Sequence, residues 1–278
     1  MKKILVTGSE GYIGKHLCKL LEDSGEYDVY GIDNTLPFDT EKYFHRDIRF
    51  LDVECEFDFP DEFDTVIHLA AFVRVNESVD KPLKYFGNNI NGTYNVLSKL
   101  KYKNFIFAST GAAENPISPY ALSKKCAEAI VEEYCNNHHK LFTTFRFYNV
   151  IGTDGFPPTN PDGLFYNLIQ AEKTGVFKIY GNDYNTPDGT AIRDYVHVMD
   201  ICHALKRAIE YSASGIENLG TGFGYTVQTI VDCYQQVNNT NFEVQYLPRR
   251  SGDAERTVLD NPSSYMLNSY VLEEMVRK

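Results

Sequence analysis

Short apolar runs alternate with amphipathic segments through the first half of the chain. The apolar runs are rich in β-branched and aromatic residues, which predicts strands, and the segments between them have helical periodicity. The predicted strands are Lys2–Thr7, Asp28–Asp33, Thr65–Ala70, Asn104–Ser109 and Phe142–Phe147. The predicted helices lie near 12–24, 82–101 and 120–138. This alternation indicates an α/β fold with a doubly wound parallel sheet.

The texture of the sequence changes after Asn149. Residues 152–163 contain three prolines and three glycines, which predicts a loop leading into a second region. Beyond it, helices are predicted near 163–174, 198–213 and 226–238, and strands near 176–180 and 242–247. We therefore expect a nucleotide-binding domain over 1–149 and a smaller α/β substrate-binding domain over 150–278. Part of 198–220 is expected to be able to pack back on the first domain.

Composition narrows the function classes. The net charge of −11 argues against a nucleic-acid-binding protein, which needs a basic face, but a few placed arginines can still hold a small anion. The N-terminal sequence lacks the apolar region of a secretion signal, and no run approaches the roughly 18 apolar residues of a membrane span. The six cysteines include no C-x-x-C pair, so we expect no metal site and free thiols in a reducing cytoplasm.

A glycine-rich turn, Thr7–Gly14, joins the first predicted strand to the first predicted helix. Glycine lets the backbone approach a pyrophosphate, and the helix N-terminus offers amide donors. G-x-x-G-x-x-G also occurs in structural turns, but its place between strand and helix favours a dinucleotide. Asp33 ends the second strand, where a carboxylate favours NAD over NADP unless it is an ordinary strand-end aspartate. Asp52 and Val53 are expected to flank the adenine.

Tyr120 and Lys124 are four residues apart in a predicted helix and project from one face. A free phenol has a pKa of about 10, and an adjacent ammonium together with a cationic nicotinamide ring favours the phenolate. Lowering that pKa to about 7 requires roughly 4 kcal/mol. Thr110, at the end of the preceding strand, is expected to hydrogen-bond the reacting oxygen of the substrate. Taken alone, this tyrosine–lysine spacing also fits an ordinary surface helix.

Together these residues resemble the extended short-chain dehydrogenase/reductase superfamily. Further segments resemble the UDP-glucose 4-epimerase family in particular: 77–83, 88–93, 181–190, 193–198, 218–220 and 248–253. The similarity extends in order over nearly the whole chain. It implies a Rossmann-like sheet, an NAD cofactor and C4 inversion of a UDP-hexose.

The resemblance also implies roles for single residues. The NAD pyrophosphate is expected at Gly8, Gly11, Tyr12, Ile13 and Gly14, and the adenosine at Asp33, Asn34, Asp52 and Val53. The rest of the cofactor is expected along Leu69, Ala70, Ala71 and Asn88, with Lys124 on the nicotinamide ribose and Tyr148 near the ring. The sugar nucleotide is expected at Asn149, at the pyrophosphate clamp of Arg193 and Arg250, and at Asp253 on the uridine ribose. Surface salt bridging is the alternative for Arg250 and Asp253.

The mechanism implied by the resemblance begins with Tyr120 taking the proton of the C4 hydroxyl while the C4 hydride passes to NAD⁺. The resulting 4-keto sugar turns over within the site, still tethered by its pyrophosphate, and regains hydride on the opposite face. Tight retention of the cofactor is expected, since its loss in mid-cycle strands the intermediate. The segments 82–101 and 120–138 resemble the helices of a four-helix dimer interface, so a homodimer is expected.

The sequence departs from the family pattern at several places. Val73 replaces a lysine, Gly163 replaces an asparagine, the segment 111–118 is short, and the C-terminus comes early. These differences suggest an opened pocket, altered scope or reduced activity. Thr257 stands where a tyrosine in the family blocks N-acetyl groups, so we hypothesise that UDP-N-acetylhexosamines fit as well as UDP-hexoses.

Two other functions remain open from the sequence. A sugar-nucleotide dehydratase or decarboxylase needs an acid directly after the strand-end threonine, whereas Gly111, Ala112 and Ala113 follow Thr110. A non-catalytic NAD-binding protein is suggested by the short segment, but the retained Tyr120 and Lys124 argue against it.

Overall fold

The computed structural model describes the chain except residues 52–59, 212 and 251–252. The chain forms two compact units. Unit 1 comprises Met1–Arg146 and Cys202–Glu217, and unit 2 comprises Phe147–Ile201 and Asn218–Lys278. None of the described helices is long and apolar enough to cross a membrane.

A seven-stranded sheet forms the centre of unit 1. Its strands are β1 (Lys2–Thr7), β2 (Tyr27–Asp33), β3 (Tyr43–His45), β4 (Phe63–His68), β5 (Tyr102–Thr110), β6 (Leu141–Phe147) and β10 (Gly215–Leu219). The order is β10-β6-β5-β4-β1-β2-β3, and the pairings from β3 through β5 are parallel. The chain thus builds outward from β1 in both directions. Ligands bind at such a reversal, outside the carboxyl ends of the strands.

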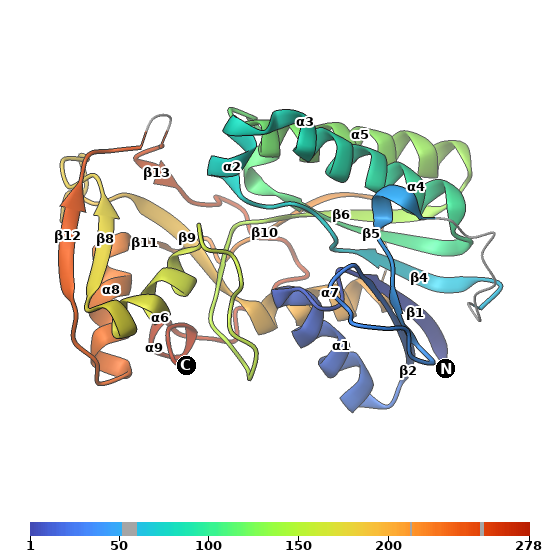
Figure 1. Cartoon of the computed structure of the whole chain (residues 1–278), viewed down its shortest axis with the longest axis horizontal. Helices are drawn as coiled ribbons and strands as arrows, with labels where there is room; N and C mark the ends of the chain where they lie inside the picture. Colours follow the sequence, from blue (N-terminus) through green and yellow to red (C-terminus); the bar gives the residue numbers. More distant parts are fainter. Residues whose placement is uncertain (52–59, 212, 251–252) are drawn as a thin grey trace. The chain divides into compact units, whose positions relative to one another are not determined.

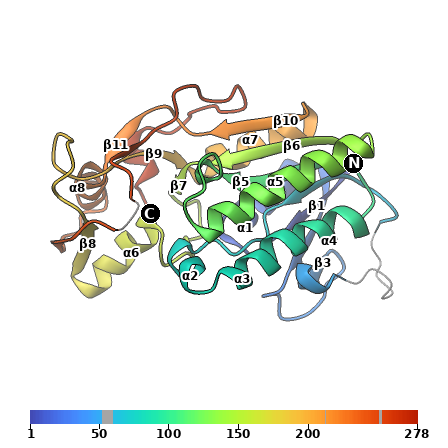
Figure 2. The same cartoon turned by 90° about the horizontal axis from the view of Figure 1, so that it is seen from above.

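Helices cover both faces of this sheet. They are α1 (Tyr12–Ser24), α2 (Val75–Asp80), α3 (Pro82–Tyr85), α4 (Asn91–Lys99), α5 (Pro119–Asn137) and α7 (Val198–Glu210). Short 3₁₀ turns are η1 (Ile48–Phe50) and η3 (Gly111–Ala113). Figure 1 and Figure 2 show α3, α4 and α5 on one face and α1 and α7 on the other. The prediction of a doubly wound, mostly parallel α/β fold is confirmed, and the five predicted strands end within two residues of their expected positions.

Local sequence explains where the two helices nearest the sheet's carboxyl edge begin. Gly11 precedes α1, and Gly25 ends it in a left-handed conformation with φ +66° that suits glycine. Ser118 caps α5 by accepting a hydrogen bond from the Ala121 amide at 3.2 Å, and Pro119 occupies the first helical position. These signals fix the start of the helix that carries Tyr120.

The predicted continuous helix over 82–101 is corrected by the structure. A π-helical turn, η2 (Phe86–Ile90), separates α3 from α4. Within it the buried Asn89 amide is fully used, because its oxygen accepts from the Phe72 amide at 2.8 Å and its nitrogen donates to Phe72 oxygen at 3.0 Å and Ser123 Oγ at 2.9 Å. Such turns occur often at functional sites. Here the turn lets one side chain join the segment after β4 to α5.

Unit 2 is a smaller α/β assembly. Its sheets comprise β7 (Asn149–Ile151), β9 (Ile192–His197), β11 (Gly224–Thr226) and β13 (Arg256–Thr257), and separately β8 (Val176–Tyr180) with β12 (Glu243–Leu247). Its helices are α6 (Leu164–Thr174), α8 (Val227–Val237) and α9 (Leu272–Met275). β9 pairs with β7, β11 and β13. The C-terminal residues Met275 and Val276 are buried in the core with Phe165 and Tyr234.

A chain of polar groups crosses the core of unit 1 at His68. Thr7 Oγ1 lies 2.7 Å from His68 Nδ1, and His68 Nε2 lies 3.0 Å from Thr93 Oγ1. The Thr93 hydroxyl donates to the Asn89 carbonyl at 2.7 Å, so it must accept from Nε2–H, and Nδ1 accepts from Thr7. Burial, aided by the charge of Lys124, lowers the pKa of His68 to about 3. The ring is therefore neutral and holds one tautomer.

This buried imidazole makes stability depend on pH. An unfolded histidine takes up a proton below about pH 6.5, whereas the folded one does not until about pH 3, so stability falls as pH drops through this window. We expect His68→Asn to be less stable at pH 7 by about 1–3 kcal/mol. Urea unfolding from pH 7 to pH 4 should show the gap from wild type narrowing, and a constant gap would contradict the assignment.

Candidate active site

The glycine-rich turn closes tightly between β1 and α1. Gly8 has φ +76°, and a Cβ on Gly14 would lie 2.0 Å from the Gly8 carbonyl oxygen, so both positions require glycine. Gly11 is the N-cap of α1 and supplies no side-chain cap, and the helix then begins with Tyr12 and Ile13. A helix N-terminus of this form can receive a pyrophosphate on its amides.

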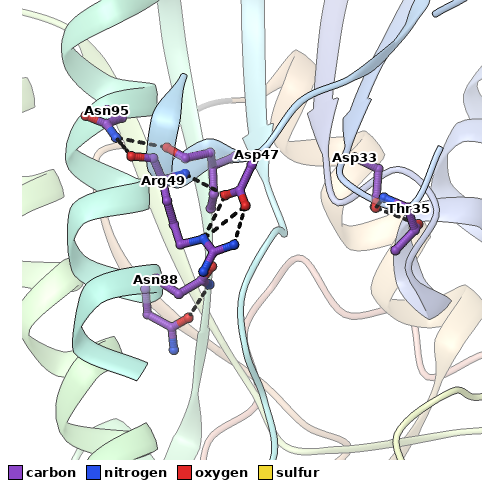
Figure 3. Close-up of polar contacts among 8 residues, drawn as sticks. Asp33, Thr35, Asp47, Arg49, Asn88 and Asn95 are labelled. Carbon is purple, nitrogen blue, oxygen red and sulfur yellow. Dashed lines mark hydrogen bonds and ion pairs between the residues drawn. The ribbon is translucent and has the colours of Figure 1, made fainter. Parts of the chain in front are cut away.

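Asp33 is held at the end of β2 beside this turn. Its Oδ2 accepts from the Glu10 amide at 3.0 Å, and its Oδ1 accepts from the Thr35 amide at 2.9 Å and hydroxyl at 2.7 Å (Figure 3). Each carboxylate oxygen can accept about two hydrogen bonds, so Oδ2 retains capacity for a ribose hydroxyl. Asn34 follows and is exposed.

A second acid at this edge, Asp47, was not predicted. It lies two residues beyond β3, whose register places His45 opposite Asp33. Its carboxylate bonds with Arg49, with Nε to Oδ1 at 2.9 Å, and this guanidinium, helped by Asn34, holds the pKa of Asp47 below its usual range. The signal was an acid two residues after a three-residue strand, which is too short to recognise from its pattern.

The neighbourhood of Asp47 is fixed by α4. Asn95 donates to the carbonyls of Ile48 and Arg49 at 2.9 Å each, as Figure 3 shows. The expected adenine contacts, Asp52 and Val53, lie outside the described residues.

The segment after β4 runs beside the glycine turn. The Leu69 amide donates to the Thr7 carbonyl at 3.1 Å, and a Cβ on Gly8 would lie 2.8 Å from the Ala70 nitrogen. Ala71 follows, and Asn88, on the π-helical turn, is buried and donates to Asn89 Oδ1 at 2.9 Å. Leu69 and Ala70 therefore lie beside the glycine turn, at the ends of β4 and β1.

The structure brings Thr110 and Tyr120 together. The Thr110 hydroxyl hydrogen-bonds the Tyr120 oxygen, and its own oxygen accepts from the Ala112 amide at 3.3 Å. Burial nevertheless raises the pKa of Tyr120 to about 12, and this hydrogen bond opposes the rise only in part. The expectation that Lys124 lowers this pKa is not met by the protein groups alone, because burial dominates.

Lys124 is buried on the same face of α5, with 3% of its surface exposed. Its ammonium lies 4.3 Å from the centre of the Phe107 ring and has no hydrogen-bond partner among the described residues. Burial lowers its pKa to about 7, although the charge of Glu128 acts in the opposite direction. Burying an ammonium group without a hydrogen-bond acceptor costs free energy, so a bound acceptor would stabilise it.

In unit 2, two of the residues predicted to bind the sugar nucleotide form an ion pair with each other. Arg193 Nη2 lies 2.9 Å from Asp253 Oδ1. Asn149, on the neighbouring strand β7, is exposed and donates to the Asp194 carbonyl at 3.0 Å. The pair places a planar, permanently charged donor and a carboxylate together on β9 and the segment before β13.

Asp194 holds this part of unit 2 in shape, a role the sequence did not reveal. It is fully buried, and its carboxylate accepts from the Thr221 amide at 2.8 Å, the Thr221 hydroxyl at 2.7 Å and the Gly222 amide at 2.9 Å. A Cβ on Gly220 would lie 3.3 Å from the Tyr148 ring. The loop after β10 therefore supports both Tyr148 and the strand of Arg193.

The two consecutive arginines near β12 differ in environment. The guanidinium of Arg250 lies 3.8 Å from the centre of the Tyr180 ring and is exposed. Arg249 instead binds Asp183, with Nε to Oδ1 at 2.7 Å, and stacks on Tyr184 at 3.9 Å. Unlike Arg249, Arg250 has no carboxylate partner among the described residues.

The structure shows where the residues that depart from the family pattern lie. Thr257 is exposed on β13, and its register partner on β9 is Arg193. Val73 is 41% exposed, and Gly163 caps α6 without a side chain. The short segment 111–118 runs from η3 directly to the Ser118 cap of α5.

A glycine turn leads into α1, an acid ends β2, and on α5 a tyrosine precedes a buried lysine by four residues. Together these features define a nucleotide-dependent enzyme of the short-chain dehydrogenase/reductase type. Residues 4–220 match the NAD dependent epimerase/dehydratase family. The chain belongs to this family.

Similar proteins agree with this membership. The UDP-glucose 4-epimerase of Rhizobium leguminosarum bv. trifolii is 31% identical, over 99% of this chain and 95% of that protein. The structure of UDP-glucose 4-epimerase from Brucella ovis in complex with NAD has a TM-score of 0.87 at 28% identity, covering 100% and 97% of the chains. The UDP-Glc/GlcNAc 4-epimerase of Campylobacter jejuni has a TM-score of 0.82 at 26% identity, covering 99% and 98%.

The buried ammonium of Lys124 should cost stability. Its folded pKa of about 7 lies below that of an unfolded lysine, so the unfolded chain binds more protons between about pH 7 and 10.5, and stability rises with pH there. We expect Lys124→Met to stabilise the nucleotide-free protein at pH 7 by about 2–4 kcal/mol. Denaturant unfolding at pH 7 and pH 10 should show this gain shrinking with pH. A variant less stable than wild type at pH 7 would refute it.

Proposed function

We propose that the protein is an isomerase that catalyses NAD-dependent C4 epimerisation of a UDP-hexose through a 4-keto intermediate. The observation that carries the proposal is the group Thr110, Tyr120 and Lys124, which unit 1 assembles at the sheet edge that also holds the glycine turn. Family membership and the activity of the named relatives support the same reaction.

The residues of unit 1 fit NAD. The N-terminus of α1, which has no side-chain cap, suits the pyrophosphate, and Asp33 suits the adenosine ribose. The buried ammonium of Lys124, which has no hydrogen-bond partner within the described part of the chain, suits a ribose hydroxyl. Asp47 adds a carboxylate beside Asn34 for the adenosine. When bound, NAD supplies the acceptor and donor of the C4 hydride and a positive ring charge.

Tyr120 is the proposed base for the C4 hydroxyl. Its pKa of about 12 means that the protein groups alone keep the phenol protonated at neutral pH. A positive charge brought close to a buried phenol lowers its pKa, so the base forms only in the loaded site. Thr110 donates to the phenolic oxygen and can accept from the substrate hydroxyl, so it can relay the proton to Tyr120.

Unit 2 supplies the proposed nucleotide anchor. Arg193 and Arg250 are assigned to the pyrophosphate, Asn149 to the phosphates, Asp253 to the uridine ribose and Tyr148 to the nicotinamide side of the site. Guanidinium groups suit phosphate because they are planar and permanently charged. A firm hold on the nucleotide leaves the sugar free to turn and present both faces of C4.

Substrate scope is proposed to include UDP-N-acetylhexosamines. Thr257 is small, exposed and beside Arg193 in the sheet, so it offers little bulk against a C2 substituent. The similarity to an enzyme named for both Glc and GlcNAc substrates agrees with this scope.

We also propose a cytoplasmic homodimer. Large apolar side chains are exposed on α3, α4 and α5, at Leu83, Tyr94 and Leu122, which suits a helical interface. The five described cysteines are free thiols, which fits a reducing compartment.

Tyr120→Phe tests the reaction. Turnover of UDP-galactose should fall by about 10²- to 10⁴-fold, because the variant lacks the proton-transferring group, while bound NAD is retained. Tyr85→Phe is the matched control, since its ring lies 6.5 Å from that of Tyr120 and its hydroxyl bonds Glu77 instead. Wild-type protein that holds NAD but converts neither UDP-galactose nor UDP-N-acetylgalactosamine would favour a non-catalytic binding role.

Thr257→Tyr tests the scope. The larger side chain should reduce kcat/KM for UDP-N-acetylgalactosamine by at least about tenfold and leave UDP-galactose within a few-fold, because a clash costs more than 1.4 kcal/mol. Thr257→Ser, which keeps the hydroxyl and adds no bulk, serves as the control. Equal losses on both substrates, or no wild-type turnover of the N-acetyl sugar, would remove Thr257 as the determinant.

A further inference from the structure

A buried carboxylate lies one helical turn beyond Lys124. Glu128 is 2% exposed and sits on α5. Its Oε1 accepts from Ser109 Oγ at 2.6 Å and from Arg146 Nε at 2.9 Å, and its Oε2 accepts from Arg146 Nη2 at 2.8 Å. Lys125 approaches Oε2 at 3.4 Å from the outer side. The carboxylate is thus fully engaged.

These contacts join three elements at the site. Ser109 immediately precedes Thr110 on β5, Arg146 comes from β6, and Glu128 shares its helix face with Lys124, four residues earlier. Because Tyr120 lies a further turn back on α5, the Glu128 carboxylate fixes the end of β5 against the helix that carries both proposed catalytic groups. A shift of one element would break a buried charged contact, which is costly.

The same carboxylate sets the charge around Lys124. The charged and titratable groups that act on the ammonium are Glu128 on α5 and neutral His68 on β4. Arg146 on β6 and Lys125 on α5 act through Glu128. Phe107 on β5 contributes only its ring face. Burial lowers the pKa of Lys124 to about 7, and Glu128 is the group that acts against burial.

We propose that Glu128 is a positioning residue of this active site, which clamps the end of β5 to α5 and supplies the negative charge that stabilises the Lys124 ammonium. Only the catalytic consequence rests on the proposed function. The clamp and its charge are properties of the folded chain.

Under this proposal, substituting either member of the Glu128–Arg146 ion pair shifts the pKa of Lys124, and the two shifts have opposite signs. Glu128→Gln leaves the Arg146 charge in place, so the pKa of Lys124 should fall by at least about 0.5 unit. Arg146→Gln leaves the carboxylate, so the pKa should rise by a similar amount. The pKa is read by NMR titration of protein labelled with [ε-¹³C]lysine, with the resonance identified by its loss in Lys124→Met. Shifts in the same direction, or none, would overturn the proposal.

A further variant guards against misfolding. Should Glu128→Gln fail to fold, the double variant Glu128→Gln/Arg146→Gln replaces it, and its Lys124 pKa must lie below that of Arg146→Gln. Ser109→Ala removes a hydrogen bond but no charge, so it should leave the Lys124 pKa unchanged while lowering kcat several-fold through the displaced Thr110. A changed Lys124 pKa in Ser109→Ala would show that packing, not charge, controls the ammonium.

Activity provides a separate readout. The alkaline limb of the kcat profile should move to lower pH in Glu128→Gln and to higher pH in Arg146→Gln, with a smaller effect on KM. The NMR shifts need no turnover, so an inactive wild-type protein with opposed shifts would refute the proposed epimerase and leave the clamp intact. Active protein without opposed shifts would refute the clamp alone.

Discussion

The burial of one positive charge organises unit 1. Lys124 is buried against the Phe107 ring and has no hydrogen-bond acceptor in the part of the chain that the structure describes. The charges of the groups around it are arranged accordingly. His68 stays neutral because burial lowers its pKa, and the charge of Lys124 adds to this effect. Glu128 supplies the opposing charge and is itself balanced by Arg146. The site is therefore arranged to hold a cation in low dielectric, where its influence on a neighbouring phenol or a bound ligand is largest.

Many features of the unit 1 site could be predicted from the sequence because they depend on local sequence patterns. The apolar run before Gly8, the capped start of the helix at Ser118 and the four-residue spacing of Tyr120 and Lys124 each report on structure within one turn or one strand. Family resemblance then extended these local signals to the distant residues of unit 2. The strands and helices fall close to their expected ends for the same reason.

What the sequence did not reveal depends on contacts between distant elements. Asp47 follows a strand of three residues, and the π-helical turn exists because Asn89 satisfies Phe72 and Ser123 at once. The high pKa of Tyr120 is likewise a packing effect, which the spacing of tyrosine and lysine cannot express. Sequence periodicity predicts which face of a helix is buried. How deeply a side chain is buried depends on all the residues that pack around it in the fold.

The ion pair of Arg193 and Asp253 has a consequence for recognition. Each is assigned to a different part of the same ligand, yet without ligand each already satisfies the other. An anion that bonds to the Arg193 nitrogen now paired with Asp253 would have to displace this carboxylate, so a ligand at that position would compete with Asp253. A weakly charged group would form interactions too weak to replace the ion pair. A diphosphate carrying a ribose could bind both residues, the arginine through phosphate and the aspartate through a ribose hydroxyl. Under the proposed function, the exchange of these partners would contribute to selectivity for the intact nucleotide.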